Sequence, residues 1–158
     1  MDDTELKNIV ERFAPSVYRL AYARTGNRTD AEDVMQETFL RLVRAAPEFR
    51  EVEHCRAWLL RVTVNCANSL FRSPWRRRTV PLDEALVQEE TGTRGEVLDA
   101  VLALPKQYRM AVHLFYYEGL SCKEAAAVLG KSEQAVKNLL HRARNLLREE
   151  LKGVELNA

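Results

Sequence analysis

Four polar residues near the end of the chain could recognise the edges of nucleic-acid bases. They recur at intervals of three and four, which places them on one face of an expected helix: Gln134, Lys137, Asn138 and His141. Amide side chains can pair bidentately with adenine, and Lys or Arg with guanine or phosphate. Three arginines follow on the same helix: Arg142, Arg144 and Arg148. Since the start of a recognition helix usually reaches bases, we predict base contact by the first set and phosphate or packing roles for the second.

A helix-turn-helix is the element that would position these side chains. Ser121 and Glu124 form the S-x-x-E capping box that begins a helix. Gly130 can adopt the left-handed conformation that ends it, and Ser132 can cap the next helix. An amphipathic helix with a merely solvated cationic face is the other interpretation of the second helix. The capped pair with its glycine turn favours DNA binding.

The distribution of charge supports nucleic-acid binding by one segment, although the chain as a whole is almost neutral. The 158-residue chain has a net charge of +1, whereas residues 131–148 contain five Lys or Arg against one Glu. The three cysteines are widely spaced, so we expect reduced thiols and neither a disulfide framework nor a metal site. We find no signal peptide and no apolar run of membrane-spanning length, and we expect a cytoplasmic protein without membrane insertion. Three scattered histidines and the absence of a glycine-rich phosphate loop favour a non-enzyme without cofactors.

Helical periodicity dominates the remainder of the chain, so we predict an all-α fold. Apolar spacing fades only in the Pro-, Gly- and charge-rich residues 74–95, which we predict to be a flexible linker. It joins two small helical domains, residues 1–73 and 96–158, and the second contains the helix-turn-helix. The expected helices span residues 4–24, 30–45, 56–72, 105–117, 121–129 and 132–151, with further helical periodicity at 96–104.

Both predicted domains resemble parts of the extracytoplasmic-function (ECF) sigma factors. Residues 104–147 resemble the promoter-reading fourth region, with Glu118-Gly119-Leu120-Ser121, Glu124-Ala125-Ala126 and Arg142-Ala143-Arg144 at the expected places. "DAEDVMQETFLRLVR" resembles the polymerase-binding helix of the second region, and "WLLRVTVNCANSLFR" its promoter-melting helix. The resemblance implies an alternative sigma factor, monomeric when free, that binds core RNA polymerase and promoter DNA and has an anti-sigma factor as partner.

The resemblance also assigns the candidate contact residues. For the minus-thirty-five element they are Ser132, Gln134, Lys137, Asn138, His141, Arg142 and Arg144. For the minus-ten element they are Phe49, Arg50, Asn65, Arg72, Arg76 and Arg77. For core polymerase they are Asp30, Glu32, Asp33, Gln36, Glu37 and Phe39.

Several of these assignments have structural alternatives. Phe49 could shelter an unstacked base or plug the core, and Trp58 fits a family position that is more often core than contact. The acids at residues 30–33 could simply favour a helix N-terminus. Ser69 stands where family members often carry Asp, which leaves the role of that position open.

Two other functions are compatible with parts of the sequence. A stand-alone helix-turn-helix regulator with an N-terminal sensing or dimerisation bundle explains residues 96–151, but leaves the match of the first domain as coincidence. A polymerase-binding or anti-sigma protein without DNA contact would leave the cationic helix unused.

Overall fold

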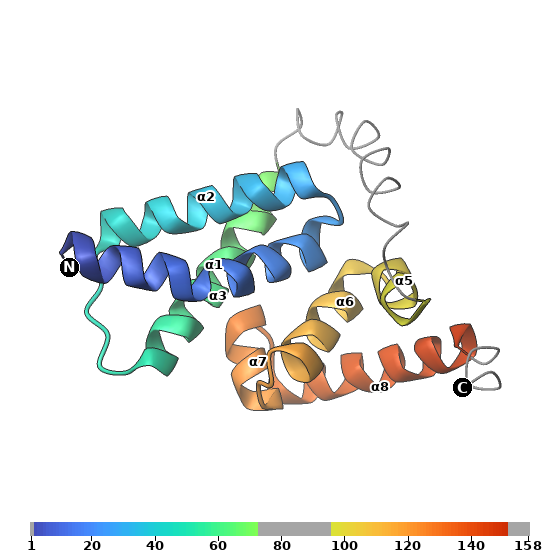
Figure 1. Cartoon of the computed structure of the whole chain (residues 1–158). Helices are drawn as coiled ribbons and strands as arrows, with labels where there is room; N and C mark the ends of the chain where they lie inside the picture. The colour runs from blue at the N-terminus through green and yellow to red at the C-terminus, as the bar shows by residue number, and fades with distance from the viewer. Residues whose placement is uncertain (1, 73–95, 152–158) are drawn as a thin grey trace.

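The computed structural model describes residues 2–72 and 96–151, with the backbone alone for residues 96–98 (Figure 1). Every regular element within these ranges is helical, which confirms the predicted all-α fold. The helices are α1 (Asp3–Thr25), α2 (Arg28–Ala45), α3 (Val52–Arg72), α5 (Glu96–Ala103), α6 (Lys106–Val112), the π-helix η1 (His113–Tyr117), α7 (Cys122–Leu129) and α8 (Glu133–Glu150). The predicted linker, with Arg76 and Arg77, lies outside the described residues.

Helices α1 to α3 form the first domain. Gly26 ends α1 at a φ of 79°, and Asn27 then caps α2 by accepting a hydrogen bond of 2.8 Å from the backbone N–H of Asp30. Helix α3 begins four residues before the predicted residue 56. The reason is Cys55, which is buried and extends the apolar spacing of Leu59 by one turn toward the N-terminus.

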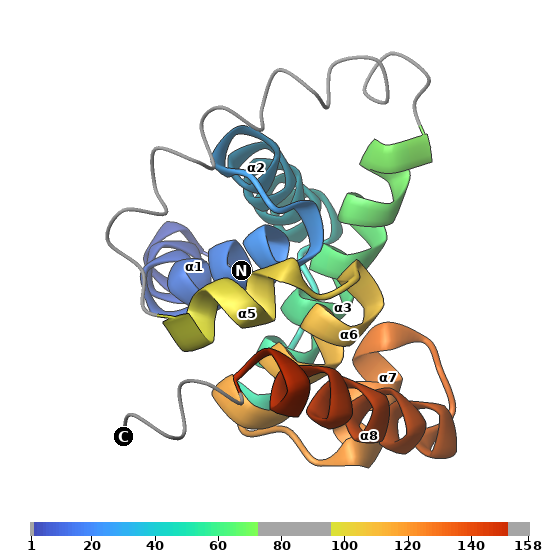
Figure 2. The same cartoon turned by 90° about the vertical axis from the view of Figure 1, so that its right-hand side faces the viewer.

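The core of the first domain consists of two clusters along α1. One lies around Phe13, Val17, Leu42 and Leu59, and the other around small residues and Val34. The small side chains let the three helices approach closely, so that α1, α2 and α3 all pack against one another (Figures 1 and 2). Helices α2 and α3 therefore each present a solvent-facing side.

Helices α5 to α8 form the second domain, around a core that includes Leu114, Val136 and Leu140. The expected helix 105–117 is divided: α6 starts after Pro105 and gives way to the π-helix η1. The backbone N–H of Glu118 bonds to the carbonyl of His113 at 2.9 Å, five residues back. This wide turn is a feature that helical periodicity alone does not predict.

The two domains pack against each other (Figures 1 and 2). Leu20 of α1 and Leu60 and Val64 of α3 belong to the same apolar cluster as the core of the second domain. Each is at most 3% exposed. The chain therefore folds with a shared core between its halves. Among the described residues, none of the helices combines the length and apolar character needed to cross a membrane.

Candidate nucleic-acid interface

The helix-turn-helix forms as the sequence predicts. The Ser121 hydroxyl accepts from the Glu124 backbone at 3.1 Å, and the Glu124 carboxylate accepts from the Ser121 backbone at 2.9 Å, which confirms the capping box. Gly130 ends α7 with a φ of 69°. The Ser132 hydroxyl then accepts from the backbone N–H of Ala135 at 3.0 Å and caps α8. These bonds fix the turn between α7 and α8.

One face of α8 is apolar and fixes which side chains remain outside. Its buried residues are Val136, Leu139, Leu140 and Ala143. Five candidate contact residues lie on the exposed surface of the helix: Gln134, Lys137, Asn138, His141 and Arg142. The Gln134 amide donates to the Asn138 carbonyl oxygen at 3.1 Å, so these two amides are already aligned. Lys137 pairs with the exposed Glu133 at 3.5 Å, a weak ion pair that a ligand can replace.

Arg144 has a partner within the second domain. Its guanidinium donates to the hydroxyl of Tyr116 and lies 5.7 Å from the centre of that ring. Tyr116 is itself 56% exposed. The structure thus gives Arg144 a packing contact, one of the two roles predicted for this part of the helix.

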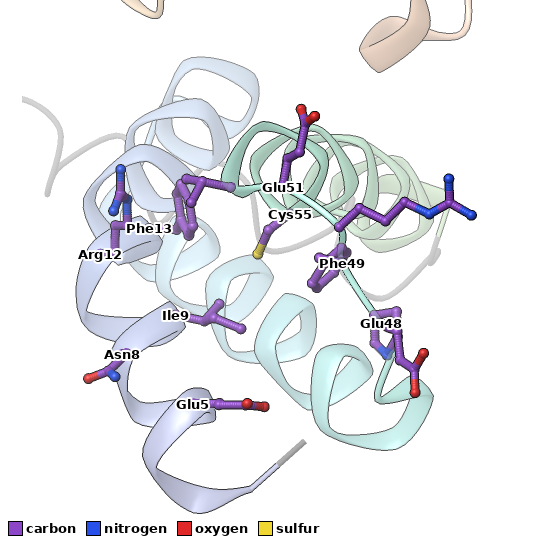
Figure 3. A pocket seen from close by; sticks show the side chains of 12 residues that line it. Glu5, Asn8, Ile9, Arg12, Phe13, Glu48, Phe49, Glu51 and Cys55 are labelled. Carbon is purple, nitrogen blue, oxygen red and sulfur yellow. The ribbon is translucent and has the colours of Figure 1, made fainter.

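A hollow of about 700 Å³ lies where the loop after α2 meets α1 (Figure 3). Phe49, Ile9 and Cys55 point into it, while Glu48 and Glu51 point away (Figure 3). Burial raises the pKa of the Cys55 thiol, which disfavours a reactive thiolate. The hollow is therefore lined by apolar groups and rimmed by charged ones.

Phe49 packs against the core of the first domain and also borders the hollow. It is half-buried, packs on the first-domain core and meets Trp58 edge-to-face, with ring centroids 6.0 Å apart. It also lines the hollow. Arg50, next along the loop, is exposed. Phe49 thus offers an aromatic surface that is held in place from behind.

Helix α3 presents a polar stripe to solvent. Asn65 and Arg72 are exposed, and a helical wheel places both within about 40° of Arg61. Ser69, one turn beyond Asn65, is also exposed. The stripe runs beside the face through which Leu60 and Val64 pack on the second domain.

Helix α2 divides its polar residues between the core and the surface. Asp30 is fully buried, and its carboxylate accepts from the Asn27 amide at 3.0 Å. The assignment of Asp30 as a surface contact is therefore corrected: it completes the cap at the start of α2. Glu32 and Asp33 are partly exposed and Gln36 is exposed. Glu37 pairs with Arg41 at 3.3 Å.

Comparison with known proteins covers both domains. The family model for sigma-70 region 2 matches residues 9–77, and that for sigma-70 region 4 matches residues 94–147. The RNA polymerase sigma-E factor of Streptomyces antibioticus is 31% identical, over 98% of this chain and 88% of its own length. The ECF RNA polymerase sigma factor SigE of Mycolicibacterium smegmatis is 34% identical, over 90% of this chain. The chain belongs to the extracytoplasmic-function sigma factors.

The extent of the match differs among the sigma factors. The chain spans only 60% of the length of the Mycolicibacterium smegmatis relative. Among solved structures, CnrH in complex with the cytosolic domain of CnrY superposes with a TM-score of 0.66 at 29% identity, covering 96% of this chain and 90% of that one. The first domain is thus sigma region two, and the second is sigma region four.

Two features of region two were not found from the sequence. Arg61 shares the α3 stripe with Asn65, but as one of many arginines it had no distinguishing signal. Leu40 and Val43 are 47% and 53% exposed on α2, on the same side as Gln36. Val43 is exposed although its spacing from the partly buried Phe39 would fit one apolar helical face. Phe39 itself packs partly buried on the core.

Proposed function

We propose that this protein is an alternative sigma factor, which binds core RNA polymerase and directs promoter-specific transcription initiation. The single observation that carries the proposal is the presence of both sigma regions in one chain, each with an exposed polar face. If the protein were a stand-alone helix-turn-helix regulator, the match of residues 9–77 to sigma-70 region 2 would have no explanation. The family acts as transcription initiation factors, so we propose no catalysis and no cofactor.

The minus-thirty-five element is read by α8 in this proposal. The amide pair Gln134–Asn138 and the neighbouring Lys137 and His141 face solvent near the start of the helix, where base edges are reached. Arg142 and Arg148 lie exposed further along and would hold phosphates. Ser132 uses its oxygen to cap the helix, and its hydroxyl proton remains available to a phosphate.

The minus-ten element is bound by the hollow and the α3 stripe. Glu5, Glu48 and Glu51 against Arg12 and Arg50 give the lining a charge of −1, which suits an uncharged base better than a phosphate. Stacking of an unstacked base on an aromatic ring stabilises binding by about 1–3 kcal/mol. We therefore propose that Phe49 receives a flipped base, that Arg50 holds the adjoining backbone, and that Asn65 and Arg72 bind the melted strand.

Core polymerase docks on α2. Glu32, Asp33, Gln36 and Glu37 provide an acidic and amide surface, which would meet a basic coiled coil and set its register. The exposed Leu40 and Val43 add apolar area to the same side of the helix. Phe39 and Asp30 support this surface from the core instead of forming it.

An anti-sigma factor is the proposed regulator of this cytoplasmic, monomeric protein. The solved structure of CnrH, with 29% identity, contains the cytosolic domain of CnrY. Two small domains joined by a linker can both be held by one inhibitor. Pull-down of the tagged chain from its native cell, followed by a transcription assay with the captured protein, tests this partner.

Run-off transcription with core polymerase on a promoter library tests the central proposal. We expect initiation at a subset of promoters that share two elements, and initiation should depend on the added protein. Arg142→Ala should lower the yield from all of them, whereas Lys7→Ala, which only breaks a surface pair with Glu11, should not change it. Binding to a palindromic duplex without any initiation would instead favour the stand-alone regulator.

A further inference from the structure

Two neighbouring tyrosines on the π-helix η1 are exposed, and one of them reaches α8. Tyr116 and Tyr117 are 56% and 62% exposed. Tyr117 stacks on His113, with ring centroids 5.2 Å apart. The Tyr116 ring instead meets the partly buried Phe115 edge-to-face at 5.0 Å, and its hydroxyl accepts a hydrogen bond from the Nε of Arg144. Tyr116 is therefore braced from the core of region four and bonded to the helix proposed to read DNA.

The partner of Arg144 in this bond is a neutral group. Lys137 on the same helix pairs with a carboxylate one turn away, Glu133, at 3.5 Å. The positions one turn before and after Arg144 hold Leu140 and Arg148, so α8 supplies it with no such acid. A hydroxyl orients a guanidinium without cancelling its charge. The positive charge of Arg144 therefore remains available to an anion.

The bond to Tyr116 also determines which donors of Arg144 it leaves for a ligand. It uses the Nε–H, whereas a guanidinium has four more N–H groups on its two outer nitrogens. Two parallel N–H groups match two oxygens of a phosphate, and a side chain that is already held in place loses less entropy on binding. The Tyr116 hydroxyl accepts the bond through its oxygen, so its proton can be donated to a phosphate as well.

Arg144 lies on one edge of the polar face of α8, and Arg142 lies on the other. At about 100° per residue, the two arginines are about 160° apart around the helix. The side chains proposed for base contact lie between them: Gln134, Asn138 and His141. A helix in the major groove has the phosphates of one strand on each side, so cations on its two edges face different strands.

We propose that Tyr116 and Arg144 form one contact to the phosphate backbone of duplex DNA, in which Tyr116 is the positioning residue for Arg144. The contact lies on the strand opposite the one held by Arg142. It rests on the proposed function in one respect, because α8 is taken to lie in the groove of the minus-thirty-five element. It extends the DNA-binding surface from the helix-turn-helix to η1. It also unites the two roles predicted for Arg144, since the packing contact sets the geometry in which the phosphate is bound.

Fluorescence anisotropy of the full chain with a labelled duplex of random sequence tests the pair, because affinity for such DNA comes from phosphate contacts. We expect Arg144→Ala to weaken binding about tenfold at low salt and to reduce the slope of log affinity against log salt by about 1. Tyr116→Phe keeps the ring and removes the hydroxyl. It should weaken binding several-fold without changing the slope, because no charge is lost. In an Arg144→Ala background the same change should have a much smaller effect.

Tyr117→Phe is the matched control. It removes a hydroxyl from the neighbouring exposed tyrosine, whose ring contacts His113 and Arg19, so DNA affinity should not change. Circular dichroism checks that every variant keeps its helix content. Full affinity in Tyr116→Phe, or an equal loss with and without Arg144, would overturn the positioning role. Full affinity in Arg144→Ala would overturn the phosphate contact itself.

Run-off transcription separates this contact from the proposed function. We expect Tyr116→Phe and Arg144→Ala to lower the yield from all responsive promoters alike, since neither residue reads bases. A wild type that binds the random duplex through this pair but never initiates transcription would refute the sigma function and leave the contact established. A loss of transcription in Tyr116→Phe at unchanged duplex affinity would assign the pair to a protein partner and overturn the DNA contact.

Discussion

Glu118 is a nearly buried carboxylate that remains ionised because its partners compensate its burial. Burial alone would raise its pKa, but hydrogen bonds from His113 and Arg56 and the charges of the same two groups outweigh that effect and lower the pKa to about 2. A carboxyl group with a lowered pKa in the folded state stabilises that state above its unfolded value, which is 4.5. This contribution is lost as the pH falls from about 4.5 to about 2.

The free energy of unfolding should therefore respond to acid through Glu118. Between pH 5 and pH 2 we expect the wild type to lose about 3 kcal/mol more than Glu118→Gln, since each pKa unit corresponds to ~1.4 kcal/mol. Urea unfolding of both proteins at pH 5, 4, 3 and 2 measures the difference. Parallel pH curves for the two proteins would show that the carboxylate gains nothing from its arginine and histidine neighbours.

Glycine is favoured at position 130 for two physical reasons and at position 119 for one. Both have φ near +70°, at 69° and 73°. A Cβ at Gly130 would also lie 2.6 Å from the Arg61 Nη1, whereas at Gly119 nothing lies within 4 Å. Arg61 can move aside, but it then loses its bond to Val128.

These two glycines provide a matched pair of variants. Gly119→Ala should lower the free energy of unfolding by about 1 kcal/mol, from the left-handed backbone alone. Gly130→Ala should cost about 1 kcal/mol more, the value of the lost hydrogen bond. In an Arg61→Ala background the excess should vanish. Urea unfolding of the wild type, the three single variants and the Arg61→Ala, Gly130→Ala double variant measures the free energies, and an excess that persists without Arg61 would place its cause elsewhere.

At the scale of the elements, the sequence predicts best what short-range patterns determine. The capping box at Ser121, the turn at Gly130 and the cap at Ser132 depend on neighbours within four residues, and all three are confirmed. The start of α3 and the π-helix η1 were missed, because they depend on burial against other helices. Asp30 shows the same limit: an acid at a helix start fits both a surface contact and a buried cap.

The first half of α8 should determine which DNA sequence is preferred, and the second half should hold the DNA backbone whatever its sequence. Lys137→Gln or Asn138→Ala is expected to change the preferred minus-thirty-five sequence, with about 1–3 kcal/mol lost at the affected base pair. Arg142→Ala and Arg148→Ala should weaken binding to all sequences alike and reduce the slope of log affinity against log salt by about 1 each. Fluorescence anisotropy with a set of duplexes at several salt concentrations measures both effects. A sequence-dependent loss in Arg142→Ala would reverse its assignment.

The packing of region two on region four belongs to the whole molecule, and the sequence does not predict it. Helical spacing marks Leu20, Leu60 and Val64 as core residues, and they are buried, but the pattern does not say that their neighbours come from the other region. Arg56 and Glu118 are 62 residues apart and have no local signature. Charge complementarity at this distance becomes visible only when the fold brings the two together.

This shared core should make the two regions unfold together. Burying one large aliphatic side chain contributes about 1.5–3 kcal/mol, so three of them amount to a large fraction of the stability of a small domain. Region two without its partner would expose them. We therefore expect a single thermal transition for the wild type, with the same midpoint by helicity and by tryptophan fluorescence.

Val136→Ala offers a directional test of this coupling. Val136 is fully buried in region four, whereas both tryptophans, Trp58 and Trp75, lie before residue 96. Removing two methyl groups costs about 2 kcal/mol, so in a coupled molecule the midpoint seen by fluorescence should fall by several degrees. In an Arg56→Ala, Arg109→Ala background, which removes hydrogen bonds between the regions, the fluorescence midpoint should respond much less to Val136→Ala, while the helicity signal still shows the destabilised region four. If the fluorescence midpoint does not change on Val136→Ala when Arg56 and Arg109 are intact, the two regions fold independently. The shared core then contributes little to their association.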